Sequence, residues 1–198
     1  MRELKYLKKL ERFANVPVFT SAEAEKKGVP GHALAYLVKR GALERVYPGA
    51  YRFSQYEPEV EFQWENLALV AASIPDGVIC LISALCYHDL TDQIMREAWV
   101  AVSHESYPPR RPNTRIIRMR NIKLGKIKIA LGEYNTYIFD RERSVVDAFR
   151  YLSKEIAIKA IQRYFQNSKY KPDPKKLGAY AKALRVNITP YIIFGTNI

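Results

Sequence analysis

The sequence predicts an α+β protein with two domains, residues 1–55 and residues 56–198. Three observations support this prediction. Helical spacing of apolar residues up to Gly41 gives way to alternation at residues 43–53, and short alternating segments recur between residues 98 and 139. Helical spacing then returns from Ser144 to the end of the chain. A length of 198 residues with 48% hydrophobic content suits one large domain or two small ones.

The first domain begins with two predicted helices. Leu4, Leu7, Leu10 and Phe13 form one apolar stripe on a helix over residues 2–14. Pro17 disfavours helical geometry at Val16, so this helix should end before it. A short second helix follows, in which Thr20 and the glutamate three residues later match a capping box.

The third predicted helix begins around Pro30 and ends at Gly41, with its leucines on one face. A hairpin over residues 43–53 follows, and its Pro-Gly pair suggests a turn longer than two residues. Helix, short helix, amphipathic helix and basic hairpin are the elements of a winged helix-turn-helix. In such a module the third helix meets base edges and the hairpin meets phosphates or a minor groove. The outward polar residues of these two elements are the candidate DNA-binding residues: His32, Tyr36, Lys39, Arg40, Arg45 and Arg52.

The second domain should be a larger mixed α/β domain with a small central sheet and C-terminal helices. "AWVAVS", "RIIRMRNI", "KIKIALGEY" and "NTYIFD" have the apolar or alternating character of strands. The apolar segment around Cys80 could be a strand or a helix, and Ser83 could cap a helix there. We expect Cys80 and Cys86 to be buried reduced thiols, as in a cytoplasmic protein.

Charge divides the chain into three blocks. Residues 1–53 carry a net charge of +6, residues 54–105 carry −8, and residues 106–198 carry +14, which gives the overall +12. Basic blocks suit a polyanion such as DNA or RNA, although they can also be solvated faces. In the C-terminal block, the proline-stiffened loop with Arg110, Arg111 and Arg115 is the best exposed candidate for a surface that binds nucleic acid or another partner.

Five segments together resemble the AbiEi antitoxins of type IV toxin–antitoxin (abortive infection, phage defence) systems. The segments are "TSAEAEKKGVPGHALAYLVKRGALERVYPGAYRF", "LISALCYHDLTDQ", "AWVAVS", "FDRERSVVDAFRY" and "LGAYAKALRV". The resemblance implies a cytoplasmic transcriptional autorepressor whose winged helix binds inverted repeats in its own promoter. It also implies that the C-terminal domain counters a nucleotidyltransferase toxin without forming a stable complex. The tail of residues 186–198 departs from the resemblance, because it is apolar and uncharged.

The sequence offers no catalytic residue, no metal ligand set and no cofactor motif. His32, His88 and His104 are too far apart to suggest a local metal pair, and His88 suits the end of a helix. No apolar run is long enough for a membrane span or a signal peptide. Two alternative functions stay open: a nuclease targeted by the winged helix, for which Asp140 and Glu142 are the closest carboxylates, and an adaptor that binds other proteins. The position of both carboxylates at a predicted helix start favours capping.

Overall fold

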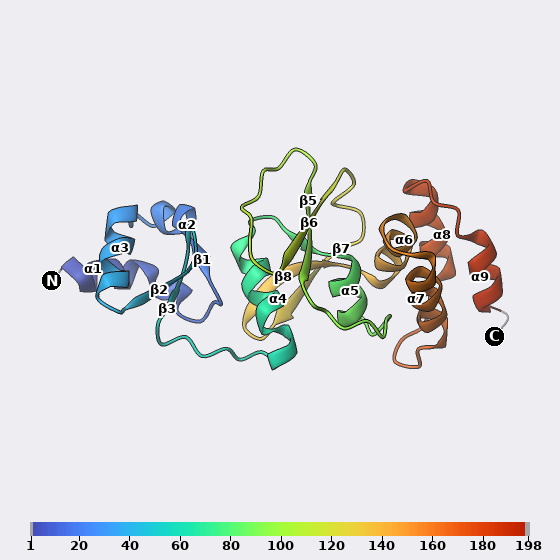
Figure 1. The fold of residues 1–198 in the computed structure, drawn as a ribbon, viewed down its shortest axis with the longest axis horizontal. Coiled ribbons are helices and arrows are strands. Elements are labelled where there is room, and N and C mark those ends of the chain that lie inside the picture. Colours follow the sequence, from blue (N-terminus) through green and yellow to red (C-terminus); the bar gives the residue numbers. More distant parts are fainter. Residues whose placement is uncertain (1, 197–198) are drawn as a thin grey trace. The chain divides into compact units, whose positions relative to one another are not determined.

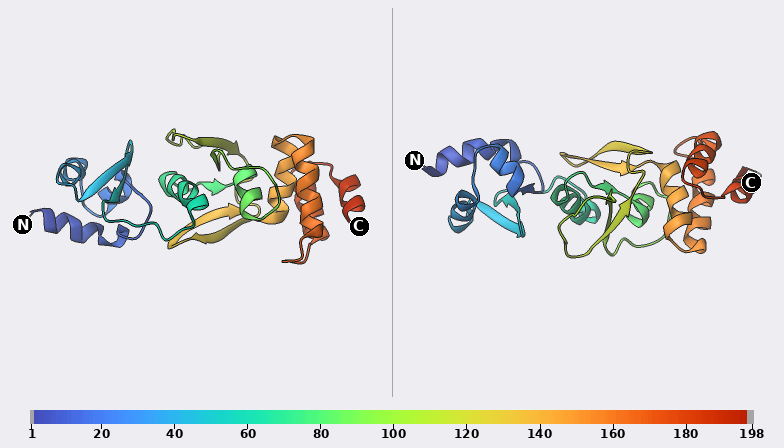
Figure 2. Two further views of the ribbon diagram at one scale, coloured as in Figure 1. Left: turned by 60° about the horizontal axis from the view of Figure 1, so that its bottom comes forward. Right: turned by 90° about the horizontal axis from the view of Figure 1, so that it is seen from above.

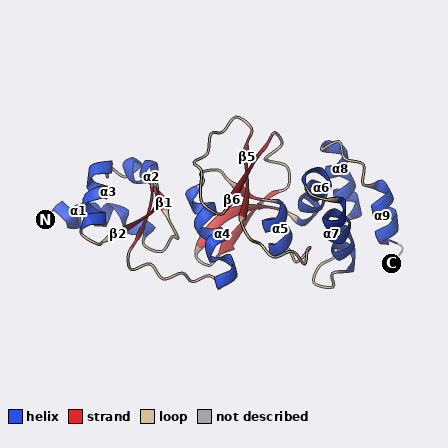
Figure 3. Ribbon diagram, viewed as in Figure 1, coloured by secondary structure: helices blue, strands red, loops and turns tan. Residues whose placement is uncertain are grey.

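A computed structural model describes residues 2–196 of the chain, and it is an α+β structure (Figures 1 and 3). Its contacts form two compact units. Unit 1 comprises Met1–Pro75 and Ala130–Thr136, and unit 2 comprises Asp76–Ile129 and Tyr137–Ile198. The boundary predicted at residue 55 thus falls inside unit 1, whose contacts extend through the next helix.

In the part of unit 1 that the structure describes up to Pro75, there are four α-helices, one 3₁₀ turn and a three-stranded antiparallel sheet. The helical elements are α1 (Arg2–Leu10), η1 (Glu11–Phe13), α2 (Ser21–Lys26), α3 (Gly31–Lys39) and α4 (Phe62–Ser73). The strands are β1 (Phe19–Thr20), β2 (Leu43–Tyr47) and β3 (Ala50–Phe53), in the order β1-β3-β2.

The core of this unit lies between its first three helices and the sheet. Leu10, Phe19, Leu34, Leu37 and Leu43 are almost fully buried in one cluster. Leu10, Leu34 and Leu37 belong to the apolar stripes predicted for the first and third helices, and their burial packs these helices on the sheet. Leu4 of the first predicted stripe is instead 64% exposed. The capping box predicted for α2 is present: Glu23 N–H donates to Thr20 Oγ1, and Thr20 N–H donates to Glu23 Oε2.

The hairpin turn differs from the prediction. Tyr47 pairs with Ala50, which leaves only Pro48 and Gly49 in the turn, and Gly49 has a φ of 74°. The strand register shifts by one residue between Arg45 and Tyr47, which forms a β-bulge. A bulge increases the local right-handed twist of the strands. This added twist helps a two-residue turn to connect the two strands of the hairpin.

Unit 2 holds most of a mixed five-stranded sheet with the order β6-β5-β4-β8-β7. The strands are β4 (Val78–Ile79), β5 (Ala98–Ser103), β6 (Thr114–Met119), β7 (Lys126–Leu131) and β8 (Tyr134–Phe139). β4 is antiparallel to β5 and parallel to β8, and β5 is parallel to β6. The helices are α5 (Leu81–Tyr87), α6 (Arg141–Tyr151), α7 (Lys154–Gln166), α8 (Pro174–Ala183) and α9 (Thr189–Thr196).

Helices α6, α7 and α8 pack together beside the sheet (Figure 2). Val145, Val146, Ala160, Tyr164 and Leu177 are buried between them. The apolar tail continues this core, since Ile188 is 1% exposed and the Tyr191 ring lies 4.9 Å from that of Phe149. Packing of Val186, Ile188, Tyr191 and Ile192 on this core accounts for part of the apolar character of the tail. The side chains of residues 193–198 lie outside the described part.

The apolar segment around Cys80 is both strand and helix, because β4 runs directly into α5. Ser83 does not cap this helix, which was a wrong prediction: the residue at the N-cap is Cys80. Ser83 instead lies inside α5, where its Oγ accepts a 2.8 Å hydrogen bond from Trp99 N–H.

Candidate nucleic-acid interface

Helix α3 has one buried and one exposed face, as its sequence pattern predicts. Ala33, Leu34 and Leu37 are at most 1% exposed. His32, Tyr36, Lys39 and Arg40 are all exposed on the outside of the helix. The outward side therefore presents an imidazole, a phenol and two cations over three turns, a set that can meet both base edges and phosphates.

The start of α3 adds a feature that the sequence analysis missed. Pro30 occupies the N-cap position and provides no side-chain hydrogen bond, and the first turn holds no acidic residue. Gly31 is exposed, and a Cβ atom added to it would meet nothing within 4 Å. Ala33 N–H bonds to the Pro30 carbonyl oxygen, and the exposed Gly31 before it leaves room for a phosphate at the positive end of the helix dipole. The absence of Ser, Thr, Asp or Asn before the helix was the available sign.

The turn between α2 and α3 is held in place by α1. Lys9 Nζ donates a 3.2 Å hydrogen bond to the carbonyl oxygen of Gly28. Ser21 N–H, at the start of α2, donates a 2.9 Å bond to the carbonyl of Gly49 in the hairpin turn. The hairpin turn and the start of α2 are therefore linked through the backbone, and a side chain of α1 is linked to the turn between α2 and α3.

The two hairpin arginines do not point the same way. Arg52 pairs in register with Glu44, while Arg45 pairs with Tyr51, so the two arginines lie on opposite faces of the hairpin. Arg52 also donates a 2.8 Å hydrogen bond from Nε to Glu44 Oε2, and its side chain is 31% exposed. Arg45 is exposed and is the better placed of the two to meet a phosphate.

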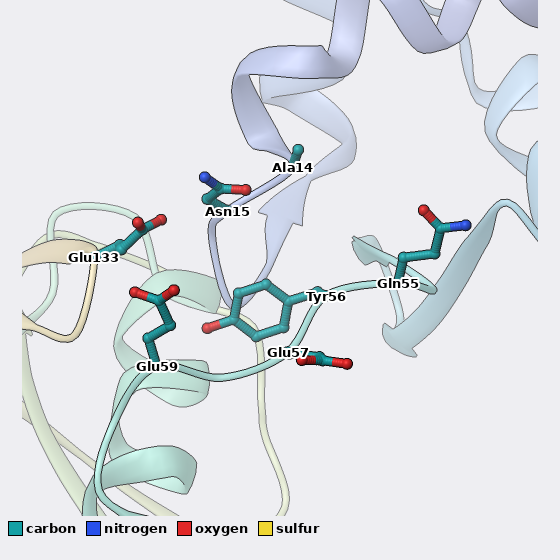
Figure 4. A pocket seen from close by; sticks show the side chains of 7 residues that line it. All are labelled: Ala14, Asn15, Gln55, Tyr56, Glu57, Glu59 and Glu133. Atoms are coloured by element: carbon teal, nitrogen blue, oxygen red, sulfur yellow. The ribbon is translucent and has the colours of Figure 1, made fainter.

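A cavity of about 210 Å³ lies elsewhere in unit 1 and is acidic (Figure 4). Glu57, Glu59 and Glu133 line it, together with Tyr56. Burial, followed by the nearby Glu65 carboxylate, raises the pKa of Tyr56. Three carboxylates would repel a phosphate, so this cavity is unsuited to nucleic acid.

The three loop arginines of the C-terminal block are not equivalent. Arg110 is exposed, and Arg115 pairs with Glu97 at 2.8 Å while its guanidinium lies 4.4 Å from the Trp99 ring centre. Arg111 is only 8% exposed, which corrects the expectation that all three are on the surface. Its side chain turns inward just before the loop rejoins the sheet, a tertiary feature that the prolines around it do not reveal.

Asp140 and Glu142, the carboxylates considered for a nuclease, are already engaged. Asp140 caps α6 by accepting a bond from Arg143 N–H, as predicted, and it also pairs with Lys176 at 3.0 Å. Glu142 accepts hydrogen bonds from Lys176 Nζ (2.9 Å) and Tyr164 Oη (2.8 Å). Burial alone would raise the pKa of Glu142, but these two hydrogen bonds outweigh it and lower the pKa.

A buried ion network lies next to this pair. Arg143, which is fully buried, donates to Asp147 Oδ2 at 2.7 Å and to the carbonyls of Asn121 and Leu124 at 2.9 and 3.0 Å. Arg150 contacts the other oxygen of Asp147 at 2.7 Å. Close by, Gly125 has a φ of 70°, and a Cβ on it would lie 2.6 Å from Arg143 Cβ. Because Arg143 and Asp147 are fully buried, these contacts fasten α6 to the segment of residues 121–125.

The remaining candidate groups also have structural surroundings. His88 ends α5, as predicted, with Nε2 2.7 Å from the Phe139 carbonyl oxygen, and burial lowers its pKa. Cys80 and Cys86 are both free thiols, with no disulfide, but only Cys80 is fully buried. Burial raises the pKa of each thiol.

Among the described side chains, no group of three or more His, Cys, Asp and Glu could hold a metal ion. No helix within residues 2–196 is long and apolar enough to cross a membrane.

Comparison with known proteins gives one family match. Residues 8–54 match the family model described as a transcriptional regulator, AbiEi antitoxin. The match runs from the last turn of α1 to just beyond the end of the hairpin and thus includes the exposed face of α3. The resemblance noted from the sequence is therefore confirmed over this segment. No curated protein matches the chain.

Proposed function

We propose that residues 2–53 form a winged helix-turn-helix that binds double-stranded DNA, with α3 in the major groove and the hairpin as the wing. The observation that carries this proposal is the exposed polar face of α3 above a fully buried apolar face. The open N-terminus of the helix supplies a phosphate contact, and the family match over residues 8–54 supports the role of a transcriptional regulator.

The chain would act as an autorepressor and antitoxin. It would bind inverted repeats in its own promoter and counter a nucleotidyltransferase toxin through the residues that follow the hairpin, without a stable complex. Its place of action would be the cytoplasm. The description of the matched family as an AbiEi antitoxin supports this part.

DNA binding can be tested by the affinity of the full chain for a labelled duplex from upstream of its own gene. Lys39→Ala combined with Arg40→Ala should weaken binding about 100-fold, because base or phosphate contacts contribute about 1–3 kcal/mol each. Lys175→Ala combined with Lys182→Ala removes the same charge from the exposed face of α8 and should leave the affinity nearly unchanged. Equal affinities of the α3 variant and the parent at physiological salt would refute the assignment of α3.

Antitoxicity needs a separate measurement. Co-expression with a nucleotidyltransferase encoded beside the gene should restore growth, while a pull-down of the two proteins should recover no complex. Growth arrest that persists on co-expression would contradict the antitoxin role without affecting the DNA-binding test.

A further inference from the structure

The segment of residues 106–132 has an unusual charge distribution that the proposed DNA-binding role does not use. It contains no Asp or Glu and eight basic residues: Arg110, Arg111, Arg115, Arg118, Arg120, Lys123, Lys126 and Lys128. Two of these residues already have a structural role, since Arg111 is buried and Arg115 pairs with Glu97. The side chains of the other six are exposed or partly exposed.

An exposed tyrosine of this segment lies against one exposed arginine, and two further exposed arginines lie within a few residues of these two along the chain. β6 is an edge strand of the five-stranded sheet, and the loop that leads into it from β5 carries Tyr107 (Figure 1). The Arg118 guanidinium lies 5.1 Å from the centre of the Tyr107 ring. Arg110 lies in the same loop as Tyr107, and Arg120 directly follows the end of β6. We call Tyr107, Arg110, Arg118 and Arg120 the β6 cluster.

The β6 cluster is accessible and its charge is not neutralised. Tyr107 is 89% exposed, so its ring has no role in the core. Among the residues that the structure describes, Arg110, Arg118 and Arg120 have no carboxylate within ion-pair distance. Prolines at positions 108, 109 and 112 restrict the loop, which lowers the entropy cost of presenting the ring to a ligand.

We propose that the β6 cluster binds single-stranded nucleic acid. An unpaired base would stack on the Tyr107 ring, and Arg118 and Arg120 would contact the adjoining phosphates. A duplex keeps its bases stacked on each other and could use only the arginines. An acidic peptide would likewise use the charges but not the ring face. This role is separate from promoter binding, because every residue of the cluster lies outside residues 2–53.

The competing explanation is protection of an exposed sheet edge. Charged side chains on edge strands prevent strand pairing between copies of a protein. Edge protection requires the arginines but not the tyrosine, and it predicts self-association when the charge is removed. The two explanations therefore differ in the effect of Tyr107→Leu.

The test is the affinity of the full chain for a fluorescent RNA strand of about 12 nucleotides, a length that such surfaces cover. DNA of the same sequence and the corresponding duplexes are measured in parallel. Tyr107→Leu should weaken single-strand binding about 5- to 100-fold and leave its salt dependence unchanged, whereas Tyr107→Phe should retain binding.

Arg118→Ala combined with Arg120→Ala should weaken binding. It should also reduce the magnitude of the slope of log K against log salt by about 1.4, because two phosphate contacts are lost. Tighter binding of RNA or of DNA identifies the natural strand.

Lys175→Ala combined with Lys182→Ala is the charge-matched control and should bind single strands like the parent. The proposal is wrong if the parent prefers duplexes, if Tyr107→Leu binds like the parent, or if the control loses as much affinity as the arginine variant. Self-association of the arginine variant with unchanged single-strand binding would establish edge protection instead. The promoter variant of Lys39 and Arg40 should keep single-strand binding, so each proposal can fail alone.

Discussion

Helix α3 and helices α6–α8 use basic residues in opposite ways. Helix α3 has few cations, yet Lys39 lies on its exposed face. The C-terminal helices belong to the most basic block of the chain, but many of their cations are bound to carboxylates of unit 2. Arg143 and Arg150 pair with Asp147, Lys159 pairs with Asp92, and Lys176 pairs with both Asp140 and Glu142.

The difference shows that net charge is a poor guide to where this chain meets a polyanion. A cation held by a carboxylate must break that pair before it can bind a phosphate, whereas an exposed cation only releases counterions. Part of the C-terminal positive charge therefore stabilises helix packing. The following substitutions test the difference between paired and exposed cations, from the largest expected effect to the smallest.

The largest effect is expected for Arg143→Met. It removes the cation of the buried network and leaves the Asn121 and Leu124 carbonyls without their donor. The free energy of unfolding should fall by about 3–5 kcal/mol, the usual cost of removing one partner of a buried ion pair. Urea denaturation followed by circular dichroism measures the change. Lys182→Ala is the surface control, and a loss below about 1 kcal/mol for Arg143→Met would show that the network is dispensable.

Lys176→Met should have a smaller effect, about 1–2 kcal/mol, because the Lys176 side chain is 39% exposed and water can reach the carboxylates it leaves. The effect should depend on pH. Since the pKa of Glu142 lies below its ordinary 4.5 in the folded state, its contribution is present above that pH and is lost as the pH falls further. Urea titrations between neutral pH and about pH 3 should show a shallower acid loss in the variant than in the parent. Parallel curves would contradict the role of Lys176.

The smallest effects concern the hairpin arginines. Arg45→Ala should weaken promoter binding about 5- to 10-fold, as expected for one lost phosphate contact. Arg52→Ala should change it less than about 2-fold, because Glu44 already binds Arg52 and the side chain points to the other face. Fluorescence anisotropy with the same duplex measures both. A larger effect of Arg52→Ala than of Arg45→Ala would mean that the hairpin meets DNA with its other face.

Local features of the fold could be predicted from the sequence. The capping box at Thr20, the two faces of α3, the cap at Asp140 and the helix-end position of His88 all depend on residues close together in the chain. Hydrophobic spacing and hydrogen-bond chemistry act over the same short range, so a single sequence contains the information.

Features that depend on distant residues could not be predicted. Nothing near Arg143 in the sequence shows that carbonyls about 20 positions earlier bind its guanidinium, and nothing near Arg111 shows that its side chain turns inward. The opposite orientation of Arg45 and Arg52 likewise depends on strand register. For the candidate interface, the sequence indicated the exposed residues of α3 correctly, but it did not reveal which hairpin arginine is already paired.

The close approach of Gly125 to Arg143 also offers a way to find related chains. A side chain at position 125 would collide with the arginine, and its φ is unfavourable for any other residue. A chain that keeps the buried network should therefore keep a glycine fifteen positions before the aspartate of an Asp-x-x-Arg segment. This spacing is a searchable fingerprint for unit 2, which lies wholly outside the matched residues 8–54.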